Sequence, residues 1–142
     1  NLAVDMLSIV HATQEALPAL KKSQGSVVNI SSIAALHPAG RQPPYGAIKA
    51  AVIHYTTTQA AMYAKDRVRV NCIAPGSIEF PGGVWDRRKT DNPALYNGTL
   101  ASIPFGRMGS PEEVASVALF LASPLAAWVT GQAIAVAGGQ GL

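Results

Sequence analysis

The sequence is poor in cysteine and in charge. Cys72 is the only cysteine among 142 residues, so no disulfide can form within the chain and no zinc site can be built from cysteines. Its apolar surroundings predict a small buried side chain. Charged residues make up 13% of the chain and hydrophobic residues 49%, which argues against disorder and for a large buried core.

The chain also has no strong charge bias and no long uninterrupted apolar run. The net charge is +3, and the densest basic run, residues 87–89, is too short to predict nucleic-acid binding. Residues 2–20 are apolar but are broken by Asp5, Glu15 and Pro18, which favours a core-facing helix over a membrane span. No secretory signal opens the sequence, so a cytoplasmic protein is expected. The three histidines lack ligand spacing, and no metal site is predicted.

Patterns typical of helices and strands alternate along the chain. Helical periodicity and start signals predict helices over residues 2–22, 45–64 and 111–122, and short apolar runs predict strands over residues 26–30, 68–73 and 132–137. Ser110, Pro111 and Glu113 form a capping-box start for the last helix. Residues 77–98 are polar and contain several glycines and prolines, which predicts a long functional or mobile loop. Such alternation predicts an α/β fold with a parallel sheet covered by helices on both faces.

Tyr45 and Lys49 lie four residues apart, on one face of the predicted second helix. An ammonium beside a phenol stabilises the phenolate and lowers a pKa that is otherwise about 10. A tyrosine tuned in this way can exchange a proton with an alcohol or carbonyl oxygen near neutral pH. Ser32 follows the first predicted strand and can hold the same oxygen, and Ser31 is the alternative for that role.

The reacting groups are expected at one edge of the sheet. Ligands of parallel sheets bind beyond the carboxyl ends of the strands, where Ser32, Tyr45 and the Pro75-Gly76 turn all fall. No side chain can supply a hydride, so a redox cofactor is required for this proton chemistry to serve oxidation or reduction.

Four segments in this order and spacing carry a family resemblance: SVVNISSIAA, PPYGAIKAAV, VRVNCIAPG and GRMGSPEEVASVALFLASPLAAWVTGQAIAVAGG. Together they resemble the second half of the short-chain dehydrogenases/reductases, over almost the whole chain. The resemblance implies a Rossmann-like, doubly wound parallel sheet and an oxidoreductase that uses NAD or NADP on an alcohol or ketone. Residues 1–142 would be the C-terminal catalytic portion of one such domain. No glycine-rich pyrophosphate turn follows a strand here, so the N-terminal nucleotide-binding half is expected to be missing from this sequence, and with it the residue that selects NAD or NADP.

The resemblance also assigns roles to individual residues. Lys49 would hold the nicotinamide ribose as well as tune Tyr45. The Pro75-Gly76 turn would pack beside the nicotinamide, and the backbone around Ile78 would bond its carboxamide. Asp5 falls where the family usually has an asparagine in a proton path, and Asn1 takes that place only if the alignment slips by four residues.

The chain departs from the family pattern at two further positions. Phe80 stands where a threonine is frequent, and Ala137 replaces the aspartate that often precedes the final glycine pair. Residues 79–98 would lie over the substrate, where Trp85 and Tyr96 either line an apolar pocket or anchor the loop.

One other reading of function stays open, and a hydrolase is disfavoured. The chain could be a truncated, catalytically inactive relative that serves as a binding or assembly module. A hydrolase would need a G-x-S-x-G nucleophile elbow, which the sequence lacks. The resemblance further implies a homodimer or homotetramer, formed through the helices around residues 2–22 and 45–64.

Overall fold

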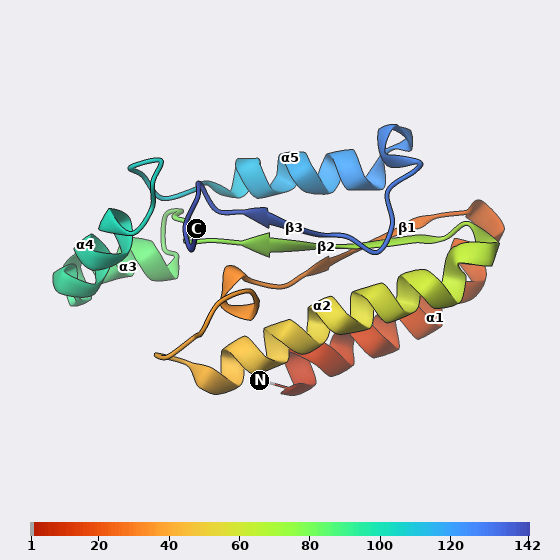
Figure 1. The fold of residues 1–142 in the computed structure, drawn as a ribbon, viewed down its shortest axis with the longest axis horizontal. Coiled ribbons are helices and arrows are strands. Elements are labelled where there is room, and N and C mark those ends of the chain that lie inside the picture. The colour runs from red at the N-terminus through yellow and green to blue at the C-terminus, as the bar shows by residue number, and fades with distance from the viewer. Residues whose placement is uncertain (1) are drawn as a thin grey trace.

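Three parallel strands form the centre of the fold. The computed structural model describes residues 2–142, with β1 at Ser26–Ile30, β2 at Arg69–Pro75 and β3 at Ala133–Val136, in the sheet order β1-β2-β3 (Figure 1). Both strand pairs are parallel. The structure therefore confirms the predicted Rossmann-like α/β architecture, and β1 matches its predicted bounds. β2 runs two residues past the prediction because Pro75, which has no N–H to donate, can still pair as the last residue of a strand.

Helices cover the two faces of this sheet. α1 spans Ser8–Ser23 and is preceded by a π-helical turn at Ala3–Leu7 (η1), α2 spans Pro43–Tyr63, and α5 spans Pro111–Ala122. In Figure 1, α5 lies on one side of the strands, and α1 and α2 lie together on the other. α2 begins at Pro43, two residues earlier than predicted, because a proline fits the first turn of a helix, where its missing N–H is not needed. The predicted start of α5 is confirmed: the Glu113 carboxylate accepts the Ser110 N–H at 2.9 Å.

The prediction of a long loop over residues 77–98 is wrong. Two short helices occupy most of this segment, α3 at Val84–Asp91 and α4 at Pro93–Ala101. Asn92 caps α4, since its side-chain oxygen accepts the Leu95 N–H at 3.0 Å, and Pro93 fills the first helical position. Pro93 therefore starts a helix here, whereas the sequence analysis counted it among the loop residues.

The hydrophobic core has one cluster on each face of the sheet. On the side of α1 and α2, Ala60, Tyr63, Val68 and Val70 pack with Val27. On the side of α5, the buried centre is Ile73, Leu121 and Ala126, with Val28 against it. Val27 and Val28 serve opposite clusters because successive side chains of a strand point to opposite faces. Burying an aliphatic side chain as large as Ile73 or Leu121 contributes about 1.5–3 kcal/mol.

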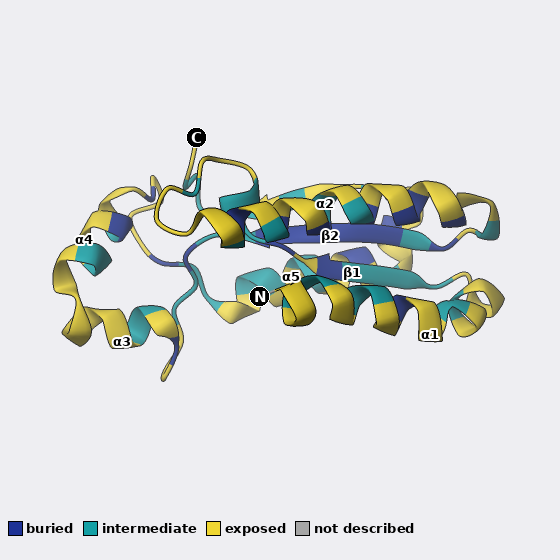
Figure 2. Cartoon of the chain, turned by 90° about the horizontal axis from the view of Figure 1, so that it is seen from below, coloured by how far each residue is buried: buried dark blue, intermediate teal, exposed yellow. Residues whose placement is uncertain are grey.

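The middle strand is the most buried element. Figure 2 shows β2 dark blue along most of its length, between helices whose outer faces are exposed. Cys72 on β2 is fully buried, as predicted, and burial raises the pKa of its thiol. Within residues 2–142, no helix is long and apolar enough to span a bilayer, and no group of three or more metal-ligating side chains occurs.

Candidate active site

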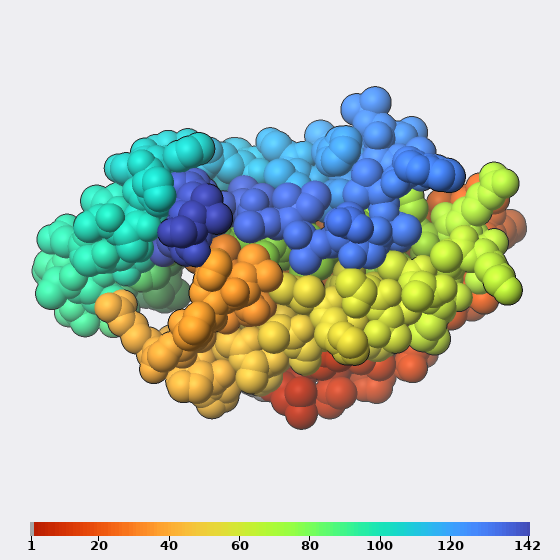
Figure 3. Space-filling view, in the orientation of Figure 1, coloured from red at the N-terminus to blue at the C-terminus, as the bar shows by residue number. Residues whose placement is uncertain are grey.

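The residues with predicted chemical roles gather at the carboxyl ends of the strands. The loop of residues 31–42 leaves β1 there, the first turn of α2 returns beside it, and the turn after β2 leads to α3 and α4 (Figure 1). Figure 3 shows the surface hollowed between the orange loop and the α3–α4 segment in green and teal. The fold thus supplies the single edge expected from the strand order.

Lys49 is a buried charged residue at this edge, with 8% of its surface exposed. Its ammonium donates to the Ile30 carbonyl at 3.2 Å and pairs with the Asp5 carboxylate at 2.9 Å. The same nitrogen lies 5.7 Å from the centre of the Tyr45 ring. An ammonium has three N–H groups, so these two contacts leave one for a further acceptor.

Asp5 reaches this site from the π-helical turn at Ala3–Leu7. The hydrogen bond from Lys49 is the main cause that holds the pKa of the Asp5 carboxyl below its usual value, although desolvation opposes it. The structure therefore brings Asp5, Lys49 and Tyr45 together. Asn1, the alternative to Asp5, lies outside the described residues.

The two serines after β1 make different contacts. Ser31 is buried, and its hydroxyl donates to the Lys49 carbonyl at 2.7 Å, which ties the end of β1 to α2. The Ser32 hydroxyl oxygen accepts the Ala34 N–H at 3.2 Å and caps the 3₁₀ turn Ile33–Ala35. A serine hydroxyl that only accepts keeps its proton for another partner. Ser32 can therefore still donate to a ligand oxygen, whereas the proton of Ser31 is already used.

A glycine allows the serine turn to approach α2. A Cβ at Gly46 would lie 2.8 Å from the Ala34 carbonyl oxygen and 2.7 Å from Ala39 Cβ, both closer than real Cβ contacts. Gly46 follows Tyr45 directly, so the absence of a side chain brings the turn that contains Ser32 against the turn that contains Tyr45. The sequence analysis did not single out Gly46, although a glycine inside a helical pattern signals a close approach.

The turn after β2 packs closely against the residues that end β3, and it presents backbone groups on its opposite side. The Gly76 N–H donates to the Val136 carbonyl at 2.9 Å, and a Cβ at Gly76 would meet Ala137 at 2.8 Å. Ile78 forms a parallel bridge with Gly109. Since a parallel bridge bonds the peptide groups on either side of one residue, the N–H and carbonyl of Ile78 itself face away from it. They form a donor–acceptor pair of the kind that a carboxamide can match.

The α3–α4 segment is fastened to this turn by a polar cluster. Tyr96 donates to the Glu79 carboxylate at 2.7 Å, and Lys89 pairs with the same carboxylate. These bonds, with that from Lys89 the stronger, hold the pKa of Glu79 below its usual value. Tyr96 thus ties α4 to the turn after β2. Phe80, at the position of the family threonine, is half-exposed.

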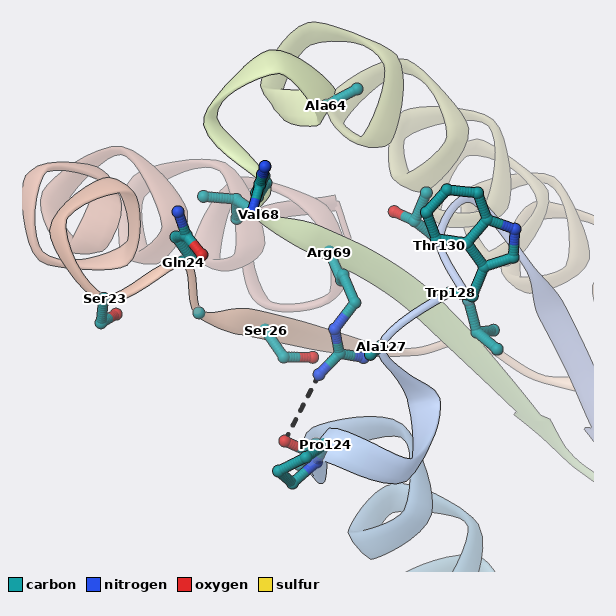
Figure 4. A pocket seen from close by; sticks show the side chains of 14 residues that line it. Ser23, Gln24, Ser26, Ala64, Val68, Arg69, Pro124, Ala127, Trp128 and Thr130 are labelled. Carbon is teal, nitrogen blue, oxygen red and sulfur yellow. Dashed lines mark hydrogen bonds between the residues drawn. The ribbon is translucent and has the colours of Figure 1, made fainter.

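Two cavities flank the sheet, one at each end. A cavity of about 590 Å³ lies at the carboxyl edge and is lined by Ile33, Ser77, Ile78 and Gln140, among others. A larger one, of about 1040 Å³, lies at the opposite end, where Ser26 and Arg69 begin their strands (Figure 4). The Arg69 guanidinium in it already donates to the carbonyls that end α5, at 2.5 Å for Leu121. The smaller cavity lies at the edge of the sheet with predicted chemistry and includes Ile78, whereas Ser32, Tyr45 and Lys49 line neither cavity.

Comparison with known proteins shows the family of the chain. The family model described as enoyl-(acyl carrier protein) reductase matches residues 1–140. The chain belongs to the short-chain dehydrogenase/reductase family. It is 42% identical to the 3-oxoacyl-[acyl-carrier-protein] reductase of Thermotoga maritima, over 96% of this chain and 54% of that protein. It is 41% identical to the L-fucose dehydrogenase of Bos taurus, over 99% of this chain and 52% of that protein.

A solved structure shares the fold at similar coverage. The 3-oxoacyl-[acyl-carrier protein] reductase of Brucella melitensis, a crystal structure with bound NAD, superposes with a TM-score of 0.84 and 31% identity. The match covers 99% of this chain and 50% of that one. The chain therefore spans about half the length of the relatives that it matches.

Proposed function

We propose that this chain carries the proton-transfer site of an oxidoreductase that uses NAD or NADP and acts on an alcohol or ketone. The observation that carries the proposal is the arrangement of Tyr45, Lys49 and Ser32 at one edge of the sheet. Lys49 lies 5.7 Å from the Tyr45 ring centre, and the turn with Ser32 packs on the helix residue that follows Tyr45. The family membership supports the same chemistry.

Each residue has a separate role in the proposed reduction. Ser32 donates its free hydroxyl proton to the substrate carbonyl oxygen and orients it. Tyr45 transfers its phenolic proton to that oxygen as the carbonyl carbon receives a hydride, so the ketone gains two electrons and two hydrogens and becomes an alcohol. Lys49 stabilises the phenolate left on Tyr45. In the oxidation direction the same proton returns to Tyr45.

The residues present fit the nicotinamide end of a dinucleotide. When bound, that cofactor supplies or accepts the hydride. The third N–H of Lys49 suits a ribose hydroxyl, and the outward N–H and carbonyl of Ile78 suit the carboxamide. Pro75 and Gly76 form the close-packed wall on that side. We propose that the adenosine end is held by a nucleotide-binding half outside residues 1–142, since the relatives are about twice as long.

A second candidate function rests on Asp5. Its carboxylate neutralises Lys49 at 2.9 Å and so opposes the stabilisation of a phenolate, as an inactive binding or assembly module would tolerate. The turnover experiment described next distinguishes the oxidoreductase from the inactive module.

The test is turnover by the intact protein with NADH or NADPH, comparing Tyr45→Phe with the unchanged protein. If Tyr45 is the proton donor, Tyr45→Phe lowers kcat at least ~100-fold. Tyr55→Phe removes a phenol from the same helix away from the site and keeps kcat within about threefold. Full activity in Tyr45→Phe would remove Tyr45 from the mechanism, and no nicotinamide turnover in the unchanged protein would favour the inactive module.

A further inference from the structure

Gln140 clamps the turn that follows β2. Its side-chain oxygen accepts the Ser77 N–H at 2.9 Å, and its side-chain nitrogen donates to the Ser77 hydroxyl at 3.1 Å. The same nitrogen lies 3.4 Å from the Ser102 hydroxyl, just past α4. One carboxamide therefore holds both the backbone and the side chain of Ser77, which is itself buried.

The C-terminal backbone is shaped to aim this side chain. Gly138 and Gly139 have φ values of 58° and 82°, in the left-handed region that favours glycine. The Gly138 carbonyl accepts the Phe105 N–H at 3.1 Å, and a Cβ at Gly139 would lie 3.0 Å from Pro104. The Gln140 N–H then closes the turn on the Ala137 carbonyl at 3.0 Å. Gly138 and Gly139 are thus held against the segment after α4, and this contact sets the position of Gln140.

The clamp acts on Ile78 through the residue before it. Gln140 holds the N–H side of Ser77, while the Ser77 carbonyl accepts the Gly109 N–H at 2.9 Å. On the far side of Ile78, the Glu79 N–H donates to the Gly109 carbonyl at 2.8 Å. Ile78 is therefore fixed between two anchored peptide groups, and its own N–H and carbonyl keep one direction. Releasing Ser77 from Gln140 leaves both Gly109 bonds in place but removes the contacts that hold the Ser77 N–H and hydroxyl, so the backbone that leads into Ile78 loses one of its supports.

We infer that Gln140 is a positioning residue for the nicotinamide carboxamide: it holds Ser77 so that the backbone of Ile78 presents a fixed donor and acceptor to that group. This inference rests on the proposed function and adds a residue whose contact spans 63 positions of the chain. Gln140 acts through Ser77 and Ile78 and does not itself take part in hydride or proton transfer.

The test compares two ligands of the intact protein. The first is the dinucleotide that the protein uses, NADH or NADPH, and the second is the matching fragment without the nicotinamide ring, ADP-ribose or its 2′-phosphate. Titration calorimetry gives Kd for both. Gln140→Leu removes the polar clamp at similar volume and is expected to weaken the dinucleotide about tenfold, because two hydrogen bonds to Ser77 are lost. Kd for the fragment is expected to stay within twofold, since the fragment has no carboxamide to place.

Two further variants separate positioning from general loss of structure. Gln140→Glu keeps an acceptor for the Ser77 N–H, and the Ser77 hydroxyl can turn to donate to it, so dinucleotide binding is expected within about threefold of the unchanged protein. Gln132→Leu changes an exposed glutamine whose side chain donates to the nearby Thr130 carbonyl, and both Kd values are expected to stay unchanged.

The outcomes separate this inference from the proposed function. Equal weakening of the dinucleotide and the fragment by Gln140→Leu, or no weakening of either, overturns the positioning role while nicotinamide turnover by the unchanged protein stands. If the unchanged protein binds neither ligand, the proposed function fails, and the positioning role fails with it.

Discussion

The Asp5 carboxylate and the Lys49 ammonium lie 2.9 Å apart, and both side chains are largely shielded from solvent. The lysine next to the proposed proton donor therefore does not act as an isolated positive charge. Shielded pairs of this kind interact more strongly than exposed ones, because less water screens them. The pair thus links the N-terminal helical turn to the chemistry proposed for Tyr45.

Asp5→Asn is expected to speed alcohol oxidation. The amide can still accept a hydrogen bond from Lys49, but the negative charge is gone, so the ammonium acts unopposed on the phenolate proposed for Tyr45. The value of kcat/KM at pH 7 is expected to rise about tenfold, the change that roughly 1.4 kcal/mol of barrier produces. Asp66→Asn is the control, since Asp66 pairs with Lys21 at 2.9 Å on the surface. An unchanged kcat/KM in Asp5→Asn would show that the carboxylate does not oppose Lys49.

Glu113 is expected to make the free energy of unfolding depend on pH in the acidic range. Two bonds from Arg107, at 2.6 and 2.9 Å, and the Ser110 N–H lower the pKa of its carboxyl from 4.5 to about 2. A lowered pKa means that this stabilisation is present above pH 4.5 and is lost as the pH falls from 4.5 to about 2.

The measurement is Tm between pH 2 and pH 6. Glu113→Gln is expected to lower Tm at pH 6 and to flatten its fall below pH 4.5, because the titrating carboxylate is absent. The exposed Glu15→Gln should leave the curve in place. A Glu113→Gln curve parallel to that of the unchanged protein over this range would contradict the prediction.

Gly46→Ala is expected to damage activity more than an alanine elsewhere in a helix. The new Cβ would lie 2.8 Å from the Ala34 carbonyl, so the turn with Ser32 must move away from α2. Overpacking of this kind costs about 1–3 kcal/mol of stability. If Ser32 and Tyr45 act on one oxygen, kcat falls at least ~10-fold even where the protein stays folded.

Gly98→Ala provides the matched control, because a Cβ in α4 at that position meets nothing within 4 Å. It is expected to stabilise the protein by about 0.4–1 kcal/mol, through a less flexible unfolded chain. Circular dichroism melting and steady-state turnover measure both variants. Normal kcat in a folded Gly46→Ala protein would show that turnover does not depend on the close approach of the Ser32 turn to Tyr45.

The framework of the fold could be predicted from local patterns. The strand at 26–30 is an apolar run after a glycine, and the helix at 111–122 has its own capping residues, so neighbouring residues decide both. The loop prediction over residues 77–98 is wrong because prolines and glycines mark helix starts as well as loops. The N-caps Gly83 and Asn92 separate the two meanings only in the folded chain.

The site could be predicted only in part. Tyr45 and Lys49 follow from helix periodicity, because four residues make about one turn. The Asp5–Lys49 pair depends on how two helices pack, and Gln140 gives no local signal because its partner is 63 residues away. Cytoplasmic location and homo-oligomer formation stay predictions.

The wide first turn of the N-terminal helix has a consequence for how this family member could diverge. At Ala3–Leu7 the backbone is wound as a π-helix, with the Ser8 N–H bonded to the Ala3 carbonyl. Such a turn holds one residue more than an α-helical turn. Deleting one residue here would let the turn close as an ordinary α-helical turn, which changes the angle from which Asp5 meets Lys49, while Leu17 and Leu20, farther along, keep their packing. The countercharge on Lys49 is thus set by the winding of one helical turn and is independent of the hydrophobic core.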